Sequence, residues 1–361
     1  MDRTGRHERL AMYALDSPAA DRANAIGLAN AEWFHSAVPR KRMKELMRRD
    51  DMPALRWTAL WLGVMLVSAG LAIATWGTWY AIVFLLVYGI LYGSGGDSRW
   101  HETGHGTPFE TRWMNAVVYQ IASFMMMREP TVWRWNHTRH HTDTIIVGMD
   151  PEIQAMRPAR LARIIVNFAG LYDVPMSFKL MFMHAFGRLT RDEEIAVPSQ
   201  EQHKVYRTAR IWLLIYAAVI ATSIFTWSIL PLLLIGGPRI YATFMHVIYA
   251  LTQHAGLQEN ALDHRLNCRT IKMCWVNRFI YWNMNYHVEH HMFPMVPSHK
   301  LPDLHADIKH DLPTMYPSIW AAYKEIIPAV LRQLRDPTYG VRRELPPGAA
   351  PYYEPIQTPA P

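Results

Sequence analysis

The chain has 361 residues, half of them hydrophobic, with 37 Lys and Arg against 30 Asp and Glu. The net charge of +7 is modest, which argues against a nucleic-acid partner, and two cysteines are too few for a disulfide framework. Long uncharged apolar runs instead predict an integral membrane protein whose spans are flanked by basic residues and whose polar part faces a reducing compartment.

The first 55 residues are polar and basic, and they lack the pattern of a cleavable signal peptide. We expect residues 1–55 to form a cytosolic region, because basic segments stay on the cytoplasmic side of membrane spans. The densest part, from Arg40 to Arg49, fits a solvated helix as well as a segment that contacts lipid headgroups.

The uncharged stretch from Trp57 to Tyr92 is too long for one membrane helix and fits two. The aromatic, glycine-containing patch at residues 76–80 is typical of an interface and marks the break between them. Both ends of this hairpin would then lie on the basic side. We expect the second helix to end in a glycine-rich turn at residues 93–96.

The next apolar segments are too short or too charged to span a bilayer. Trp113 to Met127 predicts a re-entrant or buried helix. Between Arg157 and Arg188 apolar and basic residues are mixed, as in amphipathic helices that lie at the membrane interface or pack on the soluble part.

A second long apolar block runs from Ile211 to Leu251 and is interrupted by prolines and glycines. It predicts a second hairpin whose turn lies between Trp227 and Arg239, closer to Arg239 because an arginine inside a span is costly. Residues 336–361 are rich in proline, which predicts a disordered tail.

Eight histidines fall into three clusters with the spacing of helical neighbours. Residues three and four apart share one helix face, so each cluster can direct its imidazoles toward one point. The repeated His-x-x-His-His spacing is too specific for chance and predicts a metal site. The clusters are His101 and His105; His137, His140 and His141; and His287, His290 and His291.

Eight imidazoles exceed the three or four ligands of a zinc site, so they predict two metal ions. Iron that activates dioxygen suits such a site, because imidazole binds it well and open positions remain for the oxidant. The outer ring nitrogens need acceptors. Seven residues are candidates for that role or for holding a bound water: Asp97, Asp143, Asp150, Asp263, Asn283, Asn285 and Glu289.

The segments His-Glu-Thr-Gly-His, His-Thr-Arg-His-His and Asn-Tyr-His-Val-Glu-His-His-Met-Phe-Pro resemble the histidine boxes of the membrane fatty acid desaturase superfamily, which includes related hydroxylases. The resemblance implies an all-α integral membrane fold with four transmembrane helices in two hairpins. A cytosolic helical cap would hold the dimetal site, and spans and cap together would form one catalytic domain at residues 56–335. The family also uses a ninth histidine near the end of the fourth span. Thr252-Gln253-His254 resembles that element, and His264 is the competing candidate.

The resemblance further implies two iron ions, dioxygen as co-substrate, and oxidation of an unactivated C–H bond in a fatty acyl or related substrate. Desaturation is the expected outcome, and hydroxylation of a lipid, alkane or small metabolite is the alternative. No side chain beyond the metal ligands is expected to be catalytic.

Electrons would come from an external ferredoxin, rubredoxin or cytochrome, because the sequence has no His-Pro-Gly-Gly haem motif and no cysteine set for an iron–sulfur centre. We expect the protein to lie in a bilayer, as in a bacterial inner membrane, with both termini and the active site on the cytoplasmic side.

Two other functions deserve comparison. His101-Glu102-Thr103-Gly104-His105 also matches the His-Glu-x-x-His motif of zinc proteases, but a protease leaves the other two clusters unexplained. A histidine-rich transporter or sensor would need polar ligands within the spans, and the two hairpins offer only His246.

Overall fold

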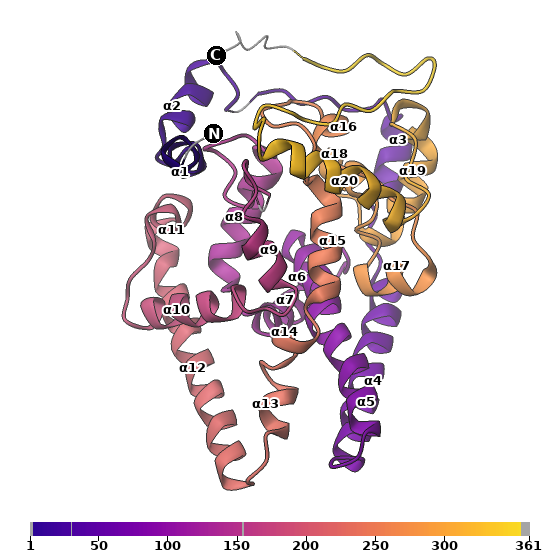
Figure 1. Ribbon diagram of the computed structural model, residues 1–361. Coiled ribbons are helices and arrows are strands. Elements are labelled where there is room, and N and C mark those ends of the chain that lie inside the picture. The colour runs from indigo at the N-terminus through magenta and orange to yellow at the C-terminus, as the bar shows by residue number, and fades with distance from the viewer. Residues whose placement is uncertain (1–2, 30, 154, 355–361) are drawn as a thin grey trace.

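A computed structural model describes residues 3–29, 31–153 and 155–354 of the chain. In these residues the chain is helical, and its only β pairings are isolated bridges, Thr270 with Tyr286 and Ile271 with Tyr316. Two helical arms project from a larger cap of shorter helices and loops (Figure 1). The expected all-α architecture is confirmed.

The first arm is the hairpin expected from the sequence. It consists of α4 (Asp51–Ala74) and α5 (Tyr80–Ile90), and α3 (Arg40–Leu46) precedes it. Asp50 begins α4 by accepting a hydrogen bond from the Met52 N–H at 2.9 Å. The hairpin turns at residues 75–79, within the aromatic patch.

The glycine-rich segment after α5 does not form the expected turn. It is a π-helical stretch, η1 (Leu91–Gly95), that continues α5 into α6 (Gly96–His105). Glycine permits close packing here, because a Cβ on Gly95 would lie 2.9 Å from Nε1 of Trp61. The Trp61 N–H donates to the Leu91 carbonyl at 2.8 Å. One long helix therefore carries the first histidine pair from the arm into the cap.

Helices on the cap side of the arms surround the end of that long helix. α7 packs along α6, and α10 lies across the direction of the arms (Figure 1). The position of these helices agrees with the expectation that residues 113–127 and 157–188 form short helices that do not span the membrane. The helices are α7 (Arg112–Met126), α8 (Pro130–Thr142), α9 (Leu161–Asn167), α10 (Asp173–Ala185) and α11 (Arg191–Ala196).

The second arm turns earlier than the sequence suggests. Its outward helix is α12 (Gln202–Phe225), preceded by η2 (Ser199–Glu201), and the chain reverses at Trp227, which is 95% exposed. The expected turn close to Arg239 is wrong: this side chain is 3% exposed and donates to Oγ1 of Thr243 at 2.8 Å. Hydropathy would place this arginine at the interface, but it lies inside the bundle and donates a hydrogen bond to Thr243.

The returning half of the second arm is broken into short helices. Prolines and glycines interrupt it, because they remove a helical N–H or favour non-helical backbone. The pieces are α13 (Leu230–Leu234), α14 (Pro238–Tyr241) and α15 (Phe244–His254). Four transmembrane helices in two hairpins were expected, and the described residues contain three helices long and apolar enough to span.

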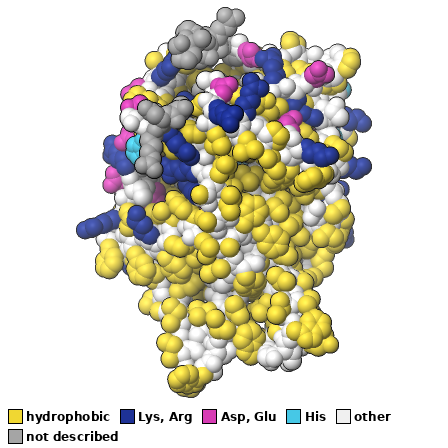
Figure 2. Space-filling view, in the orientation of Figure 1, with side chains coloured by type: hydrophobic (Ala, Val, Ile, Leu, Met, Phe, Trp, Pro, Cys, Tyr) yellow, Lys and Arg dark blue, Asp and Glu magenta, His cyan; other side chains and the backbone are white. Residues whose placement is uncertain are grey.

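Those three helical stretches are Arg40–Ala74, Tyr80–His105 and Ser199–Phe225, judged by length and apolar composition. Hydrophobic side chains cover the arms, and charged side chains gather toward the cap (Figure 2). This distribution is the one expected of a membrane protein with a polar domain on one side.

The rest of the cap is built from short helices after α15. Val288, Leu301 and Leu304 pack with Leu46 in an apolar cluster that joins the cap to the segment before the first arm. The helices are α16 (His264–Asn267), α17 (Trp275–Tyr281), α18 (His287–Met292), α19 (Leu301–Ile308) and α20 (Ile319–Gln333), with 3₁₀ turns η3 (Ser298–Lys300) and η4 (Lys309–Asp311).

Both ends of the described chain pack on the cap. In the N-terminal region, α1 (Arg3–Ala11) and α2 (Pro18–Ala25) precede α3, and Arg9 pairs with Glu259 at 2.7 Å. Residues 336–354 follow a defined path, unlike the disordered tail expected from the sequence. The Val341 N–H donates to the Gly256 carbonyl at 2.9 Å. Residues 355–361 of the expected tail lie outside the described residues.

Replacing Trp61 by Phe is expected to destabilise the protein by about 1–3 kcal/mol. The buried Leu91 carbonyl, in the first residue of the π-helix, would lose the hydrogen bond that it accepts from the indole N–H. Trp79→Phe is the matched control, since Trp79 is exposed at the tip of the arm. Thermal unfolding in detergent measures the effect. Equal melting temperatures for the two variants would contradict it.

Candidate metal centre

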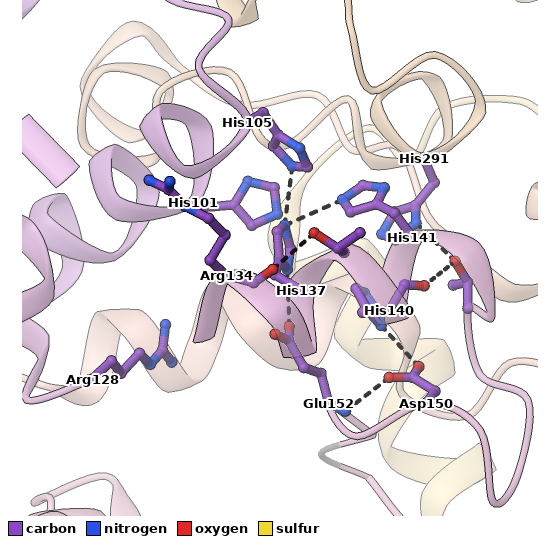
Figure 3. A network of polar contacts seen from close by, with 12 residues as sticks. His101, His105, Arg128, Arg134, His137, His140, His141, Asp150, Glu152 and His291 are labelled. Atoms are coloured by element: carbon purple, nitrogen blue, oxygen red, sulfur yellow. Dashed lines mark hydrogen bonds and ion pairs between the residues drawn. The ribbon is translucent and has the colours of Figure 1, made fainter. Parts of the chain in front are cut away.

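Four helices bring nine histidines together inside the cap. His101 and His105 lie on one face of α6, and His137, His140 and His141 lie on α8. α18 supplies His287, His290 and His291, and His254 is the last residue of α15. Figure 3 shows the α6 and α8 rings facing one another, with His291 beside His141.

The nine rings form two groups. A five-histidine group contains His101, His105, His137, His141 and His290, and a four-histidine group contains His140, His254, His287 and His291. In each group the candidate ligand nitrogens all lie within 4.8 Å of one another. The groups adjoin, because the rings of His141 and His291 stack with centroids 4.3 Å apart.

The inward nitrogens are spaced as ligands of a common ion would be. Nε2 of His137 lies 3.0 Å from Nε2 of His105 and 3.2 Å from Nε2 of His141. In the other group, Nε2 of His287 lies 3.0 Å from that of His254 and 3.1 Å from that of His291. Two nitrogens at about 2.1 Å from one ion and at right angles lie about 3.0 Å apart.

Outer partners fix the orientation of several rings. Nδ1 of His137 lies 3.0 Å from Glu152, and Nδ1 of His140 lies 2.8 Å from Asp150 (Figure 3). Nδ1 of His254 lies 2.7 Å from the Asn267 carbonyl. Each acceptor requires the proton on Nδ1, so the Nε2 lone pair points inward.

Thr144 orients a fourth ring in the same way. Its hydroxyl donates to the His140 carbonyl at 2.7 Å, and its oxygen lies 3.1 Å from Nδ1 of His291. Because the hydroxyl proton is already committed, the oxygen accepts from His291. This ring also presents its Nε2 lone pair to the four-histidine group.

Burial keeps most of these imidazoles in the form that binds metal. Burial and the neighbouring rings hold the pKa of His141, His287, His290 and His291 well below its usual range. Burial also opposes protonation of His140, but the Asp150 carboxylate outweighs it and raises the pKa of that ring. Neutral imidazoles with opposed lone pairs repel one another unless a cation lies between them, so the residues fit two metal ions.

His254 and His264, the two candidates for the ninth position, lie in different surroundings. Nε2 of His254 faces His287, as described above. His264 is stacked on Trp33 at 4.4 Å with an interplanar angle of 5°. His264 forms a third group with Cys268 and His291, and it belongs to neither of the two main groups. The geometry favours His254.

Among the seven supporting residues expected from the sequence, Asp150 is the one with a hydrogen bond to a clustered ring in the described structure. Asp97 pairs with Arg128 and lies 3.2 Å from His246, and Asp263 pairs with Arg265 at 2.7 Å. Asp143 contacts no clustered ring by hydrogen bond, and burial together with Asp150 raises its pKa to about 6.

The two asparagines and the glutamate support the backbone around α18. Asn283 donates to the Ser298 carbonyl at 2.9 Å, and Asn285 donates to the Ile271 carbonyl at 2.8 Å. Glu289 accepts from the Thr270 hydroxyl and pairs with His305. These contacts hold the loop before α18 and the helix itself.

Two carboxylates near the rings were not expected from the sequence. Glu152 contacts His137, and Glu102 is fully buried with Oε1 3.4 Å from Nδ1 of His101 and 3.5 Å from Nδ1 of His290, ion-pair distances rather than hydrogen bonds. Glu152 could have been found from its place two residues after Asp150. The proximity of Glu102 to His290 could not, because the two residues are distant in sequence.

The position of Glu102 also weakens the zinc protease interpretation. His101 and His105 share their site with three histidines from α8 and α18. A protease site needs two helical histidines, one further ligand and an open water position beside the glutamate. Glu102 instead lies fully buried between two rings of the five-histidine group.

Comparisons with known proteins agree with the histidine pattern. The model of the fatty acid desaturase family matches residues 77–323. The probable fatty acid desaturase DES1 of Sorghum bicolor is 22% identical over 277 aligned positions, covering 68% of this chain and 69% of the relative.

Two further relatives match over shorter parts. The delta(8)-fatty-acid desaturase of Euglena gracilis is 22% identical over 60% of this chain, and the delta(5) fatty acid desaturase fat-4 of Caenorhabditis elegans is 27% identical over 56%. The matched part spans 59% and 51% of these two proteins.

We expect His254→Ala to bind one metal ion fewer than the wild type, because it removes one of four inward nitrogens. His264→Ala should retain the full complement, since His264 lies outside both main groups. Metal content per folded chain, measured by mass spectrometry of the purified proteins, checks this. Metal loss in His264→Ala but not in His254→Ala would reassign the ninth ligand, and equal losses would contradict a role for His254 alone.

Asp150→Asn should weaken metal retention about 10- to 100-fold, as expected when the acceptor that orients a metal-binding histidine is lost. Asp143→Asn is the matched control, because this neighbouring carboxylate makes no hydrogen bond or ion pair with a clustered ring in the described residues. Release of metal to a competing chelator measures retention. Identical release curves would show that Asp150 does not support the site.

Proposed function

The chain belongs to the fatty acid desaturase family, and from this membership we propose that its two histidine groups hold two iron ions that use dioxygen to oxidise an unactivated C–H bond. The observation that carries the proposal is the convergence of nine imidazoles into two adjoining groups, in which the outer partners of His137, His140, His254 and His291 turn the Nε2 lone pairs of these four rings inward. The family implies an oxidoreductase, and a diiron centre is the proposed means.

The donor set favours iron over zinc. Structural zinc sites use four ligands and are rich in thiolates, whereas the five- and four-histidine groups contain no cysteine. Nitrogen donors suit divalent iron and leave positions for an oxidant. When bound, such a pair of ions would supply the oxidising power that no side chain has.

The residues of this chain provide position and exclusion of water. Asp150 and Glu152 hold the rings of His140 and His137 from outside, which keeps the two groups in register. His290 is fully buried, and His287 and His291 are each 2% exposed. Burial of these rings limits side reactions of a strong oxidant with water.

We propose desaturation of a fatty acyl or related substrate, since the relatives described above are named as fatty acid desaturases. Hydroxylation on the same scaffold would differ only in the fate of the substrate after the first hydrogen is removed. The mass of the product therefore distinguishes the two reactions.

We also propose that the cap faces the cytoplasm and receives electrons from an acidic ferredoxin, rubredoxin or cytochrome. Arg40, Lys41, Lys44 and Arg48 are exposed on and beside α3, next to the cap. Basic residues flanking spans favour the cytoplasmic side, and a positive surface speeds association with an acidic partner.

The test is mass spectrometry of lipids and acids from cells with and without the protein, with His140→Ala as the inactive control. A product two mass units lighter is expected, and one sixteen units heavier would establish hydroxylation instead. With purified components, turnover should require a carrier and fall as salt is added. Absence of any oxidised product would contradict the proposed oxidation. Turnover that does not depend on a carrier or on salt would contradict the proposed electron donor.

A further inference from the structure

The end of α10 and the facing turn of α12 form a surface of basic and aromatic side chains on the outside of the bundle. The two helices pack together there: Nε of Arg210 donates to the Ala185 carbonyl at 2.9 Å, and the centroids of the Phe178 and Tyr216 rings are 5.0 Å apart. We call this the α10–α12 surface, and its exposed residues are Lys179, Phe182, Phe186, Arg188, Arg207 and Arg210.

One face of α10 lies inside the bundle and the other lies outside. Met181, on the inner face, is buried and lines an internal cavity of about 290 Å³. Lys179, Phe182 and Phe186 follow at intervals of three and four residues, so they share the outer face. Phe182 is 53% exposed and Phe186 is 81% exposed, and both line an open groove together with Lys179 and Arg188.

The four basic side chains of the α10–α12 surface have no carboxylate within ion-pair distance in the part of the chain that the structure describes. Each acidic residue between positions 170 and 205 contacts another group: Asp173 contacts Asn167, Asp192 the Leu15 N–H, Glu193 His184, Glu194 Arg191, and Glu201 Lys204. The carbonyl end of α10 carries only about half a negative charge. The surface therefore has an excess of positive charge that an anion can neutralise.

The sequence of α12 places this surface at the level of the lipid headgroups. Arg210 is the last charged residue before the apolar part of the helix, since none of residues 211–225 is charged. Ile211 and Leu214, within about one turn of Arg210, are 49% and 71% exposed, as expected of side chains that face acyl chains. The change from exposed basic to exposed apolar side chains marks the boundary of the bilayer.

The orientation of α10 agrees with this boundary. The helix lies across the direction of the arms (Figure 1), and basic side chains lie above the hydrophobic surface of the arms (Figure 2). A helix in this orientation, with Lys or Arg and Phe on its outer side, is typical of a segment that lies in the headgroup region. Phe182 and Phe186 would there be covered by acyl chains, whereas a free phosphate ion would leave them in water.

We propose that the α10–α12 surface binds one anionic phospholipid of the leaflet next to the cap. Its headgroup lies among Lys179, Arg188 and Arg207, and its acyl chains contact Phe186 and Leu214. A lipid held there supports the outer side of the helix whose inner side walls the internal cavity. The site is separate from the metal centre, so it does not depend on the proposed oxidation.

Equilibrium binding of radiolabelled short-chain phosphatidylglycerol to the full chain in a neutral detergent tests this site. Phosphatidylcholine with the same chains is the comparison, because its headgroup has no net charge. We expect phosphatidylglycerol to bind at least about tenfold more tightly, since several cations face the headgroup. Added salt should reduce the difference, because these cations are exposed.

Arg207→Gln should lower the affinity for phosphatidylglycerol about fivefold and leave that for phosphatidylcholine unchanged. Arg56→Gln is the matched control, because Arg56 is exposed on α4 in the other arm, and this variant should bind as the wild type does. Neither side chain makes a hydrogen bond or ion pair in the described residues, so both variants should fold. Replacing Lys179, Arg188 and Arg207 together by Gln should abolish the preference.

Equal affinities of the wild type for the two lipids would overturn the proposal. Equal losses in Arg207→Gln and Arg56→Gln would do so as well, because the attraction would then be a general one between a basic protein and an anionic micelle. Glycerol 3-phosphate that competes as strongly as the lipid would also contradict it, since the acyl chains would contribute nothing. These measurements require neither bound metal nor turnover, so their outcome is distinct from that of the proposed function.

Discussion

The central constraint on this structure is the convergence of imidazole nitrogens into one buried space, where their lone pairs repel one another unless a cation lies between them. Nε2 atoms of His105, His137 and His141 face one another at 3.0–3.2 Å, and those of His254, His287 and His291 do the same. Such an arrangement is unfavourable without a cation and favourable with one. The membrane arms, the cap and the outer hydrogen bonds can all be understood as means of holding these rings in place.

Continuity of helices accounts for the position of the site. The π-helical stretch at Leu91–Gly95 lets one helix run from the membrane arm to His105, and α15 ends the second arm at His254. Both arms therefore contribute histidines directly to the site. α8 and α18, which lie in the cap, complete the groups. Acceptors behind the rings, Asp150 and Glu152 among them, determine which nitrogen faces the centre.

Local spacing predicted the histidine clusters, because helical periodicity converts sequence intervals into shared faces. Asp150 was one of seven supporting candidates and was not singled out by its spacing. Tertiary contacts decided the rest. Glu102 meets His290 only after folding, and the glycines near residue 95 serve close packing against Trp61 rather than a turn. Hydropathy placed Arg239 at an interface, whereas Thr243 and a cavity receive it inside the bundle. Prolines and glycines break the returning half of the second arm into short helices. These residues are visible in the sequence, but the sequence did not show where each short helix would begin and end.

Anomalous diffraction at the iron absorption edge, from crystals of the purified protein, tests the central claim most directly. Two adjoining peaks are expected in each molecule, one enclosed by the five-histidine group and the other by the four-histidine group. A single peak, a peak bound by other residues, or an anomalous signal that appears only at the zinc edge would contradict the account.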